Sequence, residues 1–117
     1  MRESQRDDRV ALYDMIRFGR RIGETLERYR KDGIEDDSDA ALILQRLIHI
    51  FGEAATRVSA PLREQNPQIP WQKIISMRNH LAHGYDDIAH DIILSIGNFH
   101  IPVLLKQLEI LLEEQSP

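Results

Sequence analysis

Apolar residues recur every three or four positions along most of the chain, which is the spacing of one face of an α-helix. The clearest apolar stripe consists of Leu42, Ile43, Leu47, Ile48, Phe51, Ala55 and Val58. No stretch has the two-residue alternation of a strand. Because helices with such stripes bury them against one another, the sequence predicts an all-α protein, an antiparallel bundle of four main helices plus a short one.

Helix-ending and capping residues divide the first half of the chain. The first helix is expected to end at Asp32-Gly33, and Asp37 or Ser38 is expected to cap the next one. Gly19 and Gly23 lie inside the first helix, where each costs about 1 kcal/mol of helix propensity. We therefore expect close packing against another helix at these two glycines.

Proline and glycine mark the helices of the second half. Pro70 suits the first turn of a helix, and Gly84 suits its C-terminal end. The last helix is expected to start near Asp86 or Asp87. Pro102 lies inside it and should kink it, because proline lacks the N–H that the helix ladder needs.

Length and composition fit one globular domain spanning residues 1–117. Hydrophobic residues make up 42% of the chain, which argues against intrinsic disorder. There is no cysteine, so disulfides and thiolate chemistry are excluded. The polar start lacks an apolar signal core and no apolar run could span a bilayer, so we expect a cytoplasmic protein without a membrane partner.

The formal net charge of −4 limits how the chain could hold a nucleic acid. A protein that binds nucleic acid through a broad electrostatic surface is normally basic. If this chain acts on RNA, it must use a local basic cleft or a partner. Otherwise the acidity serves solubility alone.

The densest polar cluster is the segment Arg78-Asn79-His80-Leu81-Ala82-His83-Gly84-Tyr85, here called the motif segment. Histidine transfers protons near neutral pH, and arginine grips phosphate and stabilises charge building on phosphorus. Together they suit metal-free phosphodiester cleavage in RNA, with the neighbouring 2′-hydroxyl as the attacking group. The reaction needs both a general acid and a general base, and one histidine–arginine pair per chain supplies too few groups. A two-fold dimer would bring two such pairs to one cleft. The alternative is that these residues are ordinary helix-end and surface groups.

The motif segment matches the Arg-x4-His-x-Tyr pattern of the HepT-like HEPN proteins. Ile50-Phe51-Gly52-Glu53-Ala54-Ala55 resembles the Gly-Glu-Ala element of that family, and Ile69-Pro70-Trp71 resembles its approach to the motif helix. The resemblance is densest from about residue 42 to 88, and the helical layout extends it over the whole chain.

This resemblance implies a HEPN-like homodimer with two motifs facing a shared cleft. It implies a metal-independent ribonuclease that is the toxin of a prokaryotic toxin–antitoxin pair. Arg78 and His83 would be catalytic and Asn79 would support them. The antitoxin would be a small nucleotidyltransferase of the MntA type, which attaches AMP to Tyr85. The added bulk and negative charge would then exclude RNA.

Glu53 is a further candidate, because an unpaired carboxylate in an apolar stripe is costly. We expect it to pair with Arg78 and orient it. The alternatives are a partner on its own helix, Arg46 or Arg57, or plain exposure.

The remaining histidines do not form a convincing metal site. His80, His83 and His90 are close in sequence, but no carboxylate or cysteine completes a ligand set. His49 and His100 lie within apolar stretches and are expected in the core or an interface. Trp71 is expected to be a packing anchor. No glycine-rich phosphate loop and no serine or cysteine nucleophile motif is present, and no cofactor is expected.

Three functional hypotheses follow. The first is the ribonuclease toxin, which uses the intact set of Arg78, His83 and Tyr85. The second is a non-catalytic helical partner of a nucleotidyltransferase, and the third is a purely structural bundle. The acidic balance is the main point against the first. Cleavage of RNA separates it from the second.

Overall fold

Every element that the structure describes is helical. The computed structural model describes residues 3–83 and 88–115. The elements are α1 (Glu3–Arg28), α2 (Asp39–Thr56), α3 (Ala60–Gln65), α4 (Trp71–Ala82), α5 (His90–Ser95), the π-helical turn η1 (Ile96–His100) and α6 (Ile101–Glu114). The predicted all-α class is confirmed for these ranges.

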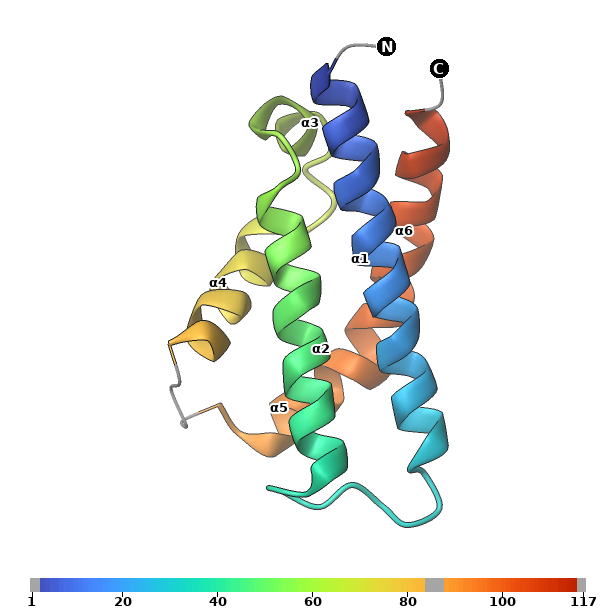
Figure 1. Ribbon diagram of the computed structural model, residues 1–117, viewed down its shortest axis with the longest axis vertical. Helices are drawn as coiled ribbons and strands as arrows, with labels where there is room; N and C mark the ends of the chain where they lie inside the picture. Colours follow the sequence, from blue (N-terminus) through green and yellow to red (C-terminus); the bar gives the residue numbers. More distant parts are fainter. Residues whose placement is uncertain (1–2, 84–87, 116–117) are drawn as a thin grey trace.

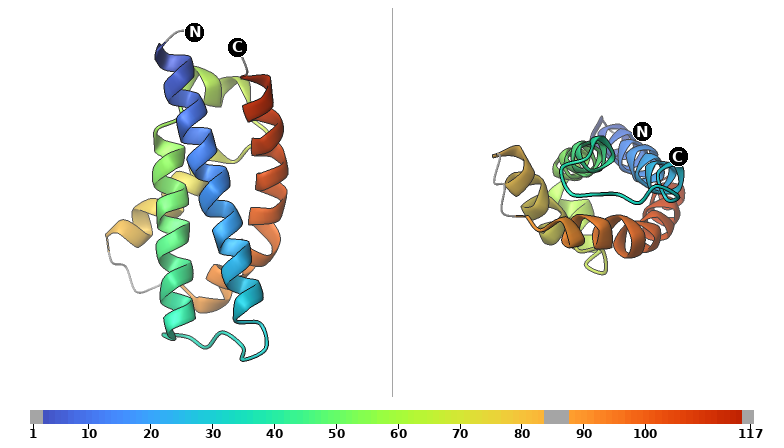
Figure 2. Two further views of the ribbon diagram at one scale, coloured as in Figure 1. Left: turned by 45° about the vertical axis from the view of Figure 1, so that its right-hand side comes forward. Right: turned by 90° about the horizontal axis from the view of Figure 1, so that it is seen from below.

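The long helices lie side by side in an elongated molecule of 46 × 27 × 21 Å. Helix α1 runs antiparallel to α2 and to α6 and packs against both (Figure 1). Helix α4 crosses α2 obliquely, on the side of α2 that faces away from α1 (Figure 2). The motif helix is therefore the outermost helix on that side, supported by α2 beneath it.

The core forms where the apolar stripes of α1, α2 and α6 meet. Its largest fully buried side chains include Phe51, Leu12, Met15, Leu44 and Leu108. The predicted role of Trp71 as a packing anchor is confirmed, since only 7% of this residue is exposed. Its indole N–H donates to the Asn66 carbonyl oxygen at 3.0 Å, which joins the start of α4 to the preceding loop.

A buried carboxylate joins α1 to the connection between α2 and α3. Asp8 is 6% exposed, and its two oxygens accept from the backbone N–H and the hydroxyl of Ser59, each at 2.7 Å. The same Ser59 hydroxyl caps α3 by accepting from the Leu62 N–H. One carboxylate thus positions the loop that leads towards α4.

The predicted caps and glycine contacts are partly right. Ser38 is the N-cap of α2, and its hydroxyl accepts from the Ala41 N–H. A Cβ at Gly19 would lie 2.7 Å from Leu105 Cδ2, so close packing is confirmed there. At Gly23 nothing lies within 4 Å, and the same prediction is wrong. Gly23 lies on the solvent side of α1, where propensity alone does not reveal packing.

The end of the chain is not one kinked α-helix as predicted. Helix α5 begins at His90, and a π-helical turn separates it from α6. Pro102 lies in the first turn of α6, immediately after the wide turn. Proline cannot donate to the carbonyl four residues earlier and its ring crowds that group, so a wider turn before it relieves the conflict.

Two of the predicted boundaries involve residues that lie outside the described ranges. These are Gly84 as the stop of the motif helix and Asp86 or Asp87 as the start of the last one. Pro70 is the N-cap of α4 rather than its first helical residue. Among the helices described, none has the length and apolar character needed to cross a membrane.

Candidate functional site

The position of the motif helix is set by Gly52 of α2. Gly52 is buried, and a Cβ built on it would overlap Cβ of Arg78. The same Cβ would lie 3.3 Å from the backbone carbonyl oxygen of Ile74. The absence of a side chain at Gly52 therefore lets α4 approach α2 closely at the residue that begins the motif.

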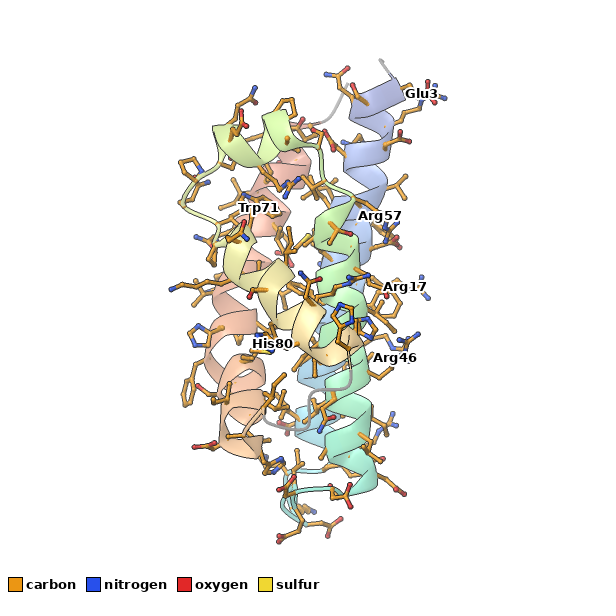
Figure 3. All side chains as sticks on the ribbon, turned by 90° about the vertical axis from the view of Figure 1, so that its left-hand side faces the viewer. Glu3, Arg17, Arg46, Arg57, Trp71 and His80 are labelled. Carbon is orange, nitrogen blue, oxygen red and sulfur yellow. The ribbon has the colours of Figure 1, made fainter. Side chains whose placement is uncertain are left out.

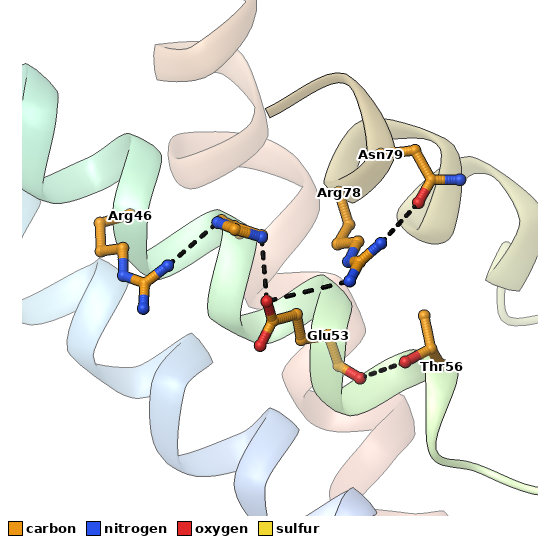
Figure 4. Close-up of polar contacts among 6 residues, drawn as sticks. Arg46, Glu53, Thr56, Arg78 and Asn79 are labelled. Atoms are coloured by element: carbon orange, nitrogen blue, oxygen red, sulfur yellow. Dashed lines mark hydrogen bonds and ion pairs between the residues drawn. The ribbon is translucent and has the colours of Figure 1, made fainter. Parts of the chain in front are cut away.

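The side chain of Arg78 is half-buried at this helix crossing, and its guanidinium reaches the surface between α4 and α2. Its NH1 donates to Asn79 Oδ1 at 2.9 Å, and its NH2 lies 3.9 Å from Glu53 Oε1 (Figure 4). Its Nε is buried and has no hydrogen-bond partner within the described part of the chain. A guanidinium carries five N–H donors, so its exposed edge retains donors for an anion. Asn79 and Glu53 thus orient the guanidinium of Arg78 without occupying all of its N–H donors.

Glu53 faces the motif helix, one of the arrangements left open by the sequence. Its Oε1 lies 3.0 Å from His49 Nε2 and 3.9 Å from Arg78 NH2. The two arginines on its own helix have other partners: Arg57 pairs with a carboxylate of α1, and Arg46 donates to His49. Glu53 is thus neither paired with its helical arginines nor simply exposed, and its carboxylate lies between a histidine and the motif arginine.

His49 extends this polar arrangement along α2. Arg46 NH1 lies 3.1 Å from His49 Nδ1. Arginine only donates, so Nδ1 is the acceptor and the ring hydrogen of the neutral imidazole is on Nε2. Nε2 lies 3.0 Å from Glu53 Oε1, but the geometry of this contact is not that of a hydrogen bond. The sequence analysis placed His49 in the core or an interface and missed this role. The signal was present in the spacing, because residues three and four apart on a helix are neighbours, and Arg46, His49 and Glu53 have that spacing.

His83 is the C-cap of α4 and is exposed. Its backbone N–H donates to the Asn79 carbonyl oxygen at 3.1 Å, which ends the helix at the motif. His80 is exposed on the same helix, next to the Arg46 edge of the molecule (Figure 3). Tyr85, the candidate for modification, lies outside the described residues. Arg78, Asn79 and Glu53 are therefore in contact, and His83 closes the same helix one turn later.

The remaining histidines lie elsewhere. His90 Nε2 lies 2.7 Å from the Ile34 carbonyl oxygen and ties the start of α5 to the loop after α1. His100 is exposed and lines an apolar hollow beside α4. Within residues 3–83 and 88–115, no three histidine, aspartate or glutamate side chains converge as metal ligands.

That hollow lies on the other side of α4 from Glu53. It has a volume of about 210 Å³, and Ile74 and Met77 of α4 line one wall while Ile92 and Leu104 line the other. The adjoining surface of α5, η1 and α6 exposes 47% of Ile92, 71% of Phe99 and 58% of Val103. The motif helix therefore has a charged side towards α2 and an apolar side towards α6.

The comparisons with known proteins identify the family of the chain. A family model described as "Ribonuclease HepT-like" matches residues 15–111. The chain belongs to the HepT-like ribonuclease family. The matched region of this HepT-like chain includes Gly52, Glu53 and the whole motif segment.

Named relatives of this HepT-like protein come from an archaeon and a bacterium. The chain is 26% identical over 107 residues to "Putative RNase MJ1380" of Methanocaldococcus jannaschii, which covers 92% of this chain and 98% of that protein. It is 30% identical over 94 residues to "Putative RNase TTE0752" of Caldanaerobacter subterraneus subsp. tengcongensis, which covers 78% of this chain and 84% of that protein. No solved structure gives a significant match to the chain.

Proposed function

We propose that this protein is a cytoplasmic endoribonuclease that cuts RNA without a metal ion, with Arg78 and His83 as its catalytic residues. The observation that carries the proposal is the placement of Arg78. Gly52 admits it to the surface of α2, while Asn79 and Glu53 orient it and leave donors free. The family and the names of the two relatives support RNA as the substrate.

In the proposed reaction the 2′-oxygen of a ribose bonds to the adjacent phosphorus, and the bond from phosphorus to the 5′-oxygen breaks. A histidine takes the proton of the 2′-hydroxyl, and a second histidine gives a proton to the departing 5′-oxygen. Arg78 stabilises the negative charge on the phosphorane oxygens. The products are a 2′,3′-cyclic phosphate and a 5′-hydroxyl.

Because the reaction needs two proton carriers, we propose that the working form is a homodimer in which each protomer supplies one His83. The apolar hollow beside α4 and the exposed side chains of Ile92, Phe99 and Val103 support this assembly. The hollow is lined in part by Ile74 and Met77 of α4. A two-fold contact there would therefore bring the two α4 helices, each ending at His83, towards each other. Val103→Asp should give a monomer that no longer cleaves RNA. Val10→Asp, at 56% exposure on α1, is the matched control and should remain a dimer when weighed by light scattering.

We further propose that the protein is the toxin of a toxin–antitoxin pair and that an MntA-type nucleotidyltransferase inhibits it by modifying Tyr85. In that step the tyrosine oxygen bonds to the α-phosphorus of ATP, pyrophosphate leaves, and the hydroxyl proton passes to a base of the partner. The new phosphodiester would add one negative charge and the bulk of the adenosine to each modified chain, and both would oppose the binding of RNA. Intact-mass spectrometry after incubation with the partner and ATP would show one AMP per modified chain, and Tyr85→Phe would abolish it.

The experiment that tests the central proposal is cleavage of RNA by the purified protein in the presence of EDTA. His83→Ala and Arg78→Ala should each abolish cleavage while circular dichroism shows that they remain folded. His80→Ala is the matched control, since it removes an exposed histidine from the same helix. Products ending in a 2′,3′-cyclic phosphate would support the mechanism.

Two results would count against the proposal. Cleavage that survives in His83→Ala would mean that another nuclease contaminates the sample or that another group carries the proton. A dimeric wild type with unmodified Tyr85 that cuts no RNA would instead favour the non-catalytic partner of a nucleotidyltransferase.

A further inference from the structure

Four of the twelve arginines of this acidic chain lie on the surface formed by α1 and α2. Arg17 and Arg21 of α1 and Arg46 and Arg57 of α2 are all exposed, and here they are called the basic face. Figure 3 shows Arg57, Arg17 and Arg46 along one edge of the molecule, next to the end of α4 that carries His80. The chain as a whole has a net charge of −4, so this face opposes the average.

Two of these arginines are ordered by an aromatic ring and not by acids. Arg17 Cζ lies 5.0 Å and Arg21 Cζ lies 5.5 Å from the centroid of the Phe18 ring. Within the described chain neither guanidinium forms an ion pair with a carboxylate. Stacking on a ring fixes the plane of a guanidinium and leaves its N–H donors free, which suits the binding of phosphate.

The basic face passes beside the motif arginine, Arg78. The ion pair of Arg57 with Asp14, at 3.2 Å, fixes how α1 and α2 are aligned. From the helical rise, Arg17 and Arg21 then lie about 4 and 10 Å along the face from Arg57, and Arg46 lies about 16 Å along it. Arg46 is joined through His49 and Glu53 to Arg78. Arg78 packs at Gly52 and lies 3.9 Å from Glu53, which are about 6–8 Å along α2 from Arg57. The motif arginine therefore lies beside the middle of this row of cations.

The carboxylates near this path do not neutralise it. Asp14 is committed to Arg57, and Glu53 lies between His49 and Arg78. Glu24, Glu109 and Glu113 line the same hollow as Arg17 and Arg21. Glu109 pairs with Arg20, and among the described residues none of the three acids forms an ion pair with Arg17 or Arg21. Within residues 3–83 and 88–115, Arg17, Arg21 and Arg46 have no acidic partner in an ion pair.

From this arrangement we infer that the basic face is the RNA-binding track of the protein, in which Arg17, Arg21 and Arg46 bind backbone phosphates of the strand whose neighbouring bond reaches Arg78. The inference rests on the proposed function and adds where the strand lies. It also explains how a chain with a net charge of −4 could bind RNA, since the RNA would contact only this local cluster of arginines. The contacts are to phosphates, so the track itself reads no base sequence.

The test uses Arg17→Gln/Arg21→Gln, because these residues lie on α1 and, among the described residues, no hydrogen bond or ion pair joins them to Arg78, Asn79 or Glu53. The matched control is Arg30→Gln/Lys31→Gln, which removes the same charge from the loop after α1, away from the basic face. Both pairs are introduced into the His83→Ala background to prevent cleavage. Binding of a fluorescently labelled single-stranded RNA is measured by anisotropy between 0.1 and 1 M salt.

Each lost phosphate contact lowers the slope of log K against log salt concentration by about 0.7 for a single strand. The slope for the double variant should therefore be smaller in magnitude by about 1.4. Relative to any difference that remains at 1 M salt, its affinity at 0.1 M salt should be about 25-fold below that of the parent. The control should match its parent. In the catalytically intact background the double variant should raise KM for cleavage and leave the single-turnover rate at saturating RNA unchanged.

The outcomes separate this inference from the function on which it rests. If the parent cleaves RNA and the double variant binds and cleaves as the control does, the track is wrong and the nuclease stands. If no RNA is cleaved but binding still depends on Arg17 and Arg21, the track stands and the catalytic proposal fails. If the double variant and the control bind RNA equally well, the track is overturned. The basic face would then be free to bind an acidic protein instead.

Discussion

Replacement of Gly52 by alanine tests whether the helix crossing, and not the motif alone, makes the site. The new Cβ would overlap Cβ of Arg78 and lie 3.1 Å from its Cγ and 3.3 Å from the Ile74 carbonyl oxygen. Two of these three atoms cannot be moved by rotating a side chain, so α4 must shift away from α2. Arg78 would then move with the helix that carries it.

The size of the effect follows from two opposing terms. Overpacking a well-packed contact costs about 1–3 kcal/mol. Replacing glycine by alanine inside a helix gains about 1 kcal/mol. Gly52→Ala should therefore lower the free energy of unfolding by about 0–2 kcal/mol. A displacement of the order of 1 Å at a catalytic group lowers the cleavage rate by about 100-fold.

Gly23→Ala is the matched control, because Gly23 lies inside α1 with nothing within 4 Å of its Cβ position. It should show only the helix-propensity gain, about 1 kcal/mol. Urea unfolding followed by circular dichroism gives both stabilities, and cleavage of one labelled RNA gives both rates. The reasoning is refuted if Gly52→Ala is stabilised as much as Gly23→Ala and cleaves at the wild-type rate.

Three further changes test other contacts. Asp8→Ala leaves the half-buried Ser59 N–H and hydroxyl without their acceptor and should lower the free energy of unfolding by about 1–3 kcal/mol, measured by urea unfolding. Trp71→Phe loses the hydrogen bond to the Asn66 carbonyl oxygen and should lower Tm by about 4–8 °C in a thermal melt, whereas an unchanged Tm would mean that water replaces the indole at no cost. Glu53→Gln keeps the shape of the side chain but removes the charge facing Arg78, so it should slow cleavage several-fold and leave Tm within about 2 °C, and a wild-type rate would show that Glu53 does not position the arginine.

The sequence was sufficient to predict the helical class because nearly every helix buries a stripe of apolar residues with helical spacing. The same periodicity could not reveal the π-helical turn, since a stripe interrupted by one extra residue still looks helical over short windows. Proline at position 102 signalled a disturbance, and only the packed structure shows that the backbone widens before it.

The site was predictable only in part, because its residues come from two helices. The spacing within α4 identified Arg78 and Asn79, and an out-of-place carboxylate in α2 identified Glu53. The contact of Gly52 with Arg78 depends on how α4 crosses α2, and no spacing within either segment encodes that crossing. The basic face was hidden for a similar reason, since its four arginines are distributed over α1 and α2 among eight acidic residues.

The crossing of α2 and α4 has room for one β-carbon, and residue 78 supplies it. Positions 52 and 78 are therefore not free to vary independently as the family diverges. Lineages that keep the arginine should keep the glycine. A lineage that acquires a side chain at position 52 should have glycine at position 78 or a wider separation of the two helices, because every other residue at 78 also carries a Cβ. Aligned sequences should show this joint variation as a pair of positions that change together, although 26 residues separate them in the chain.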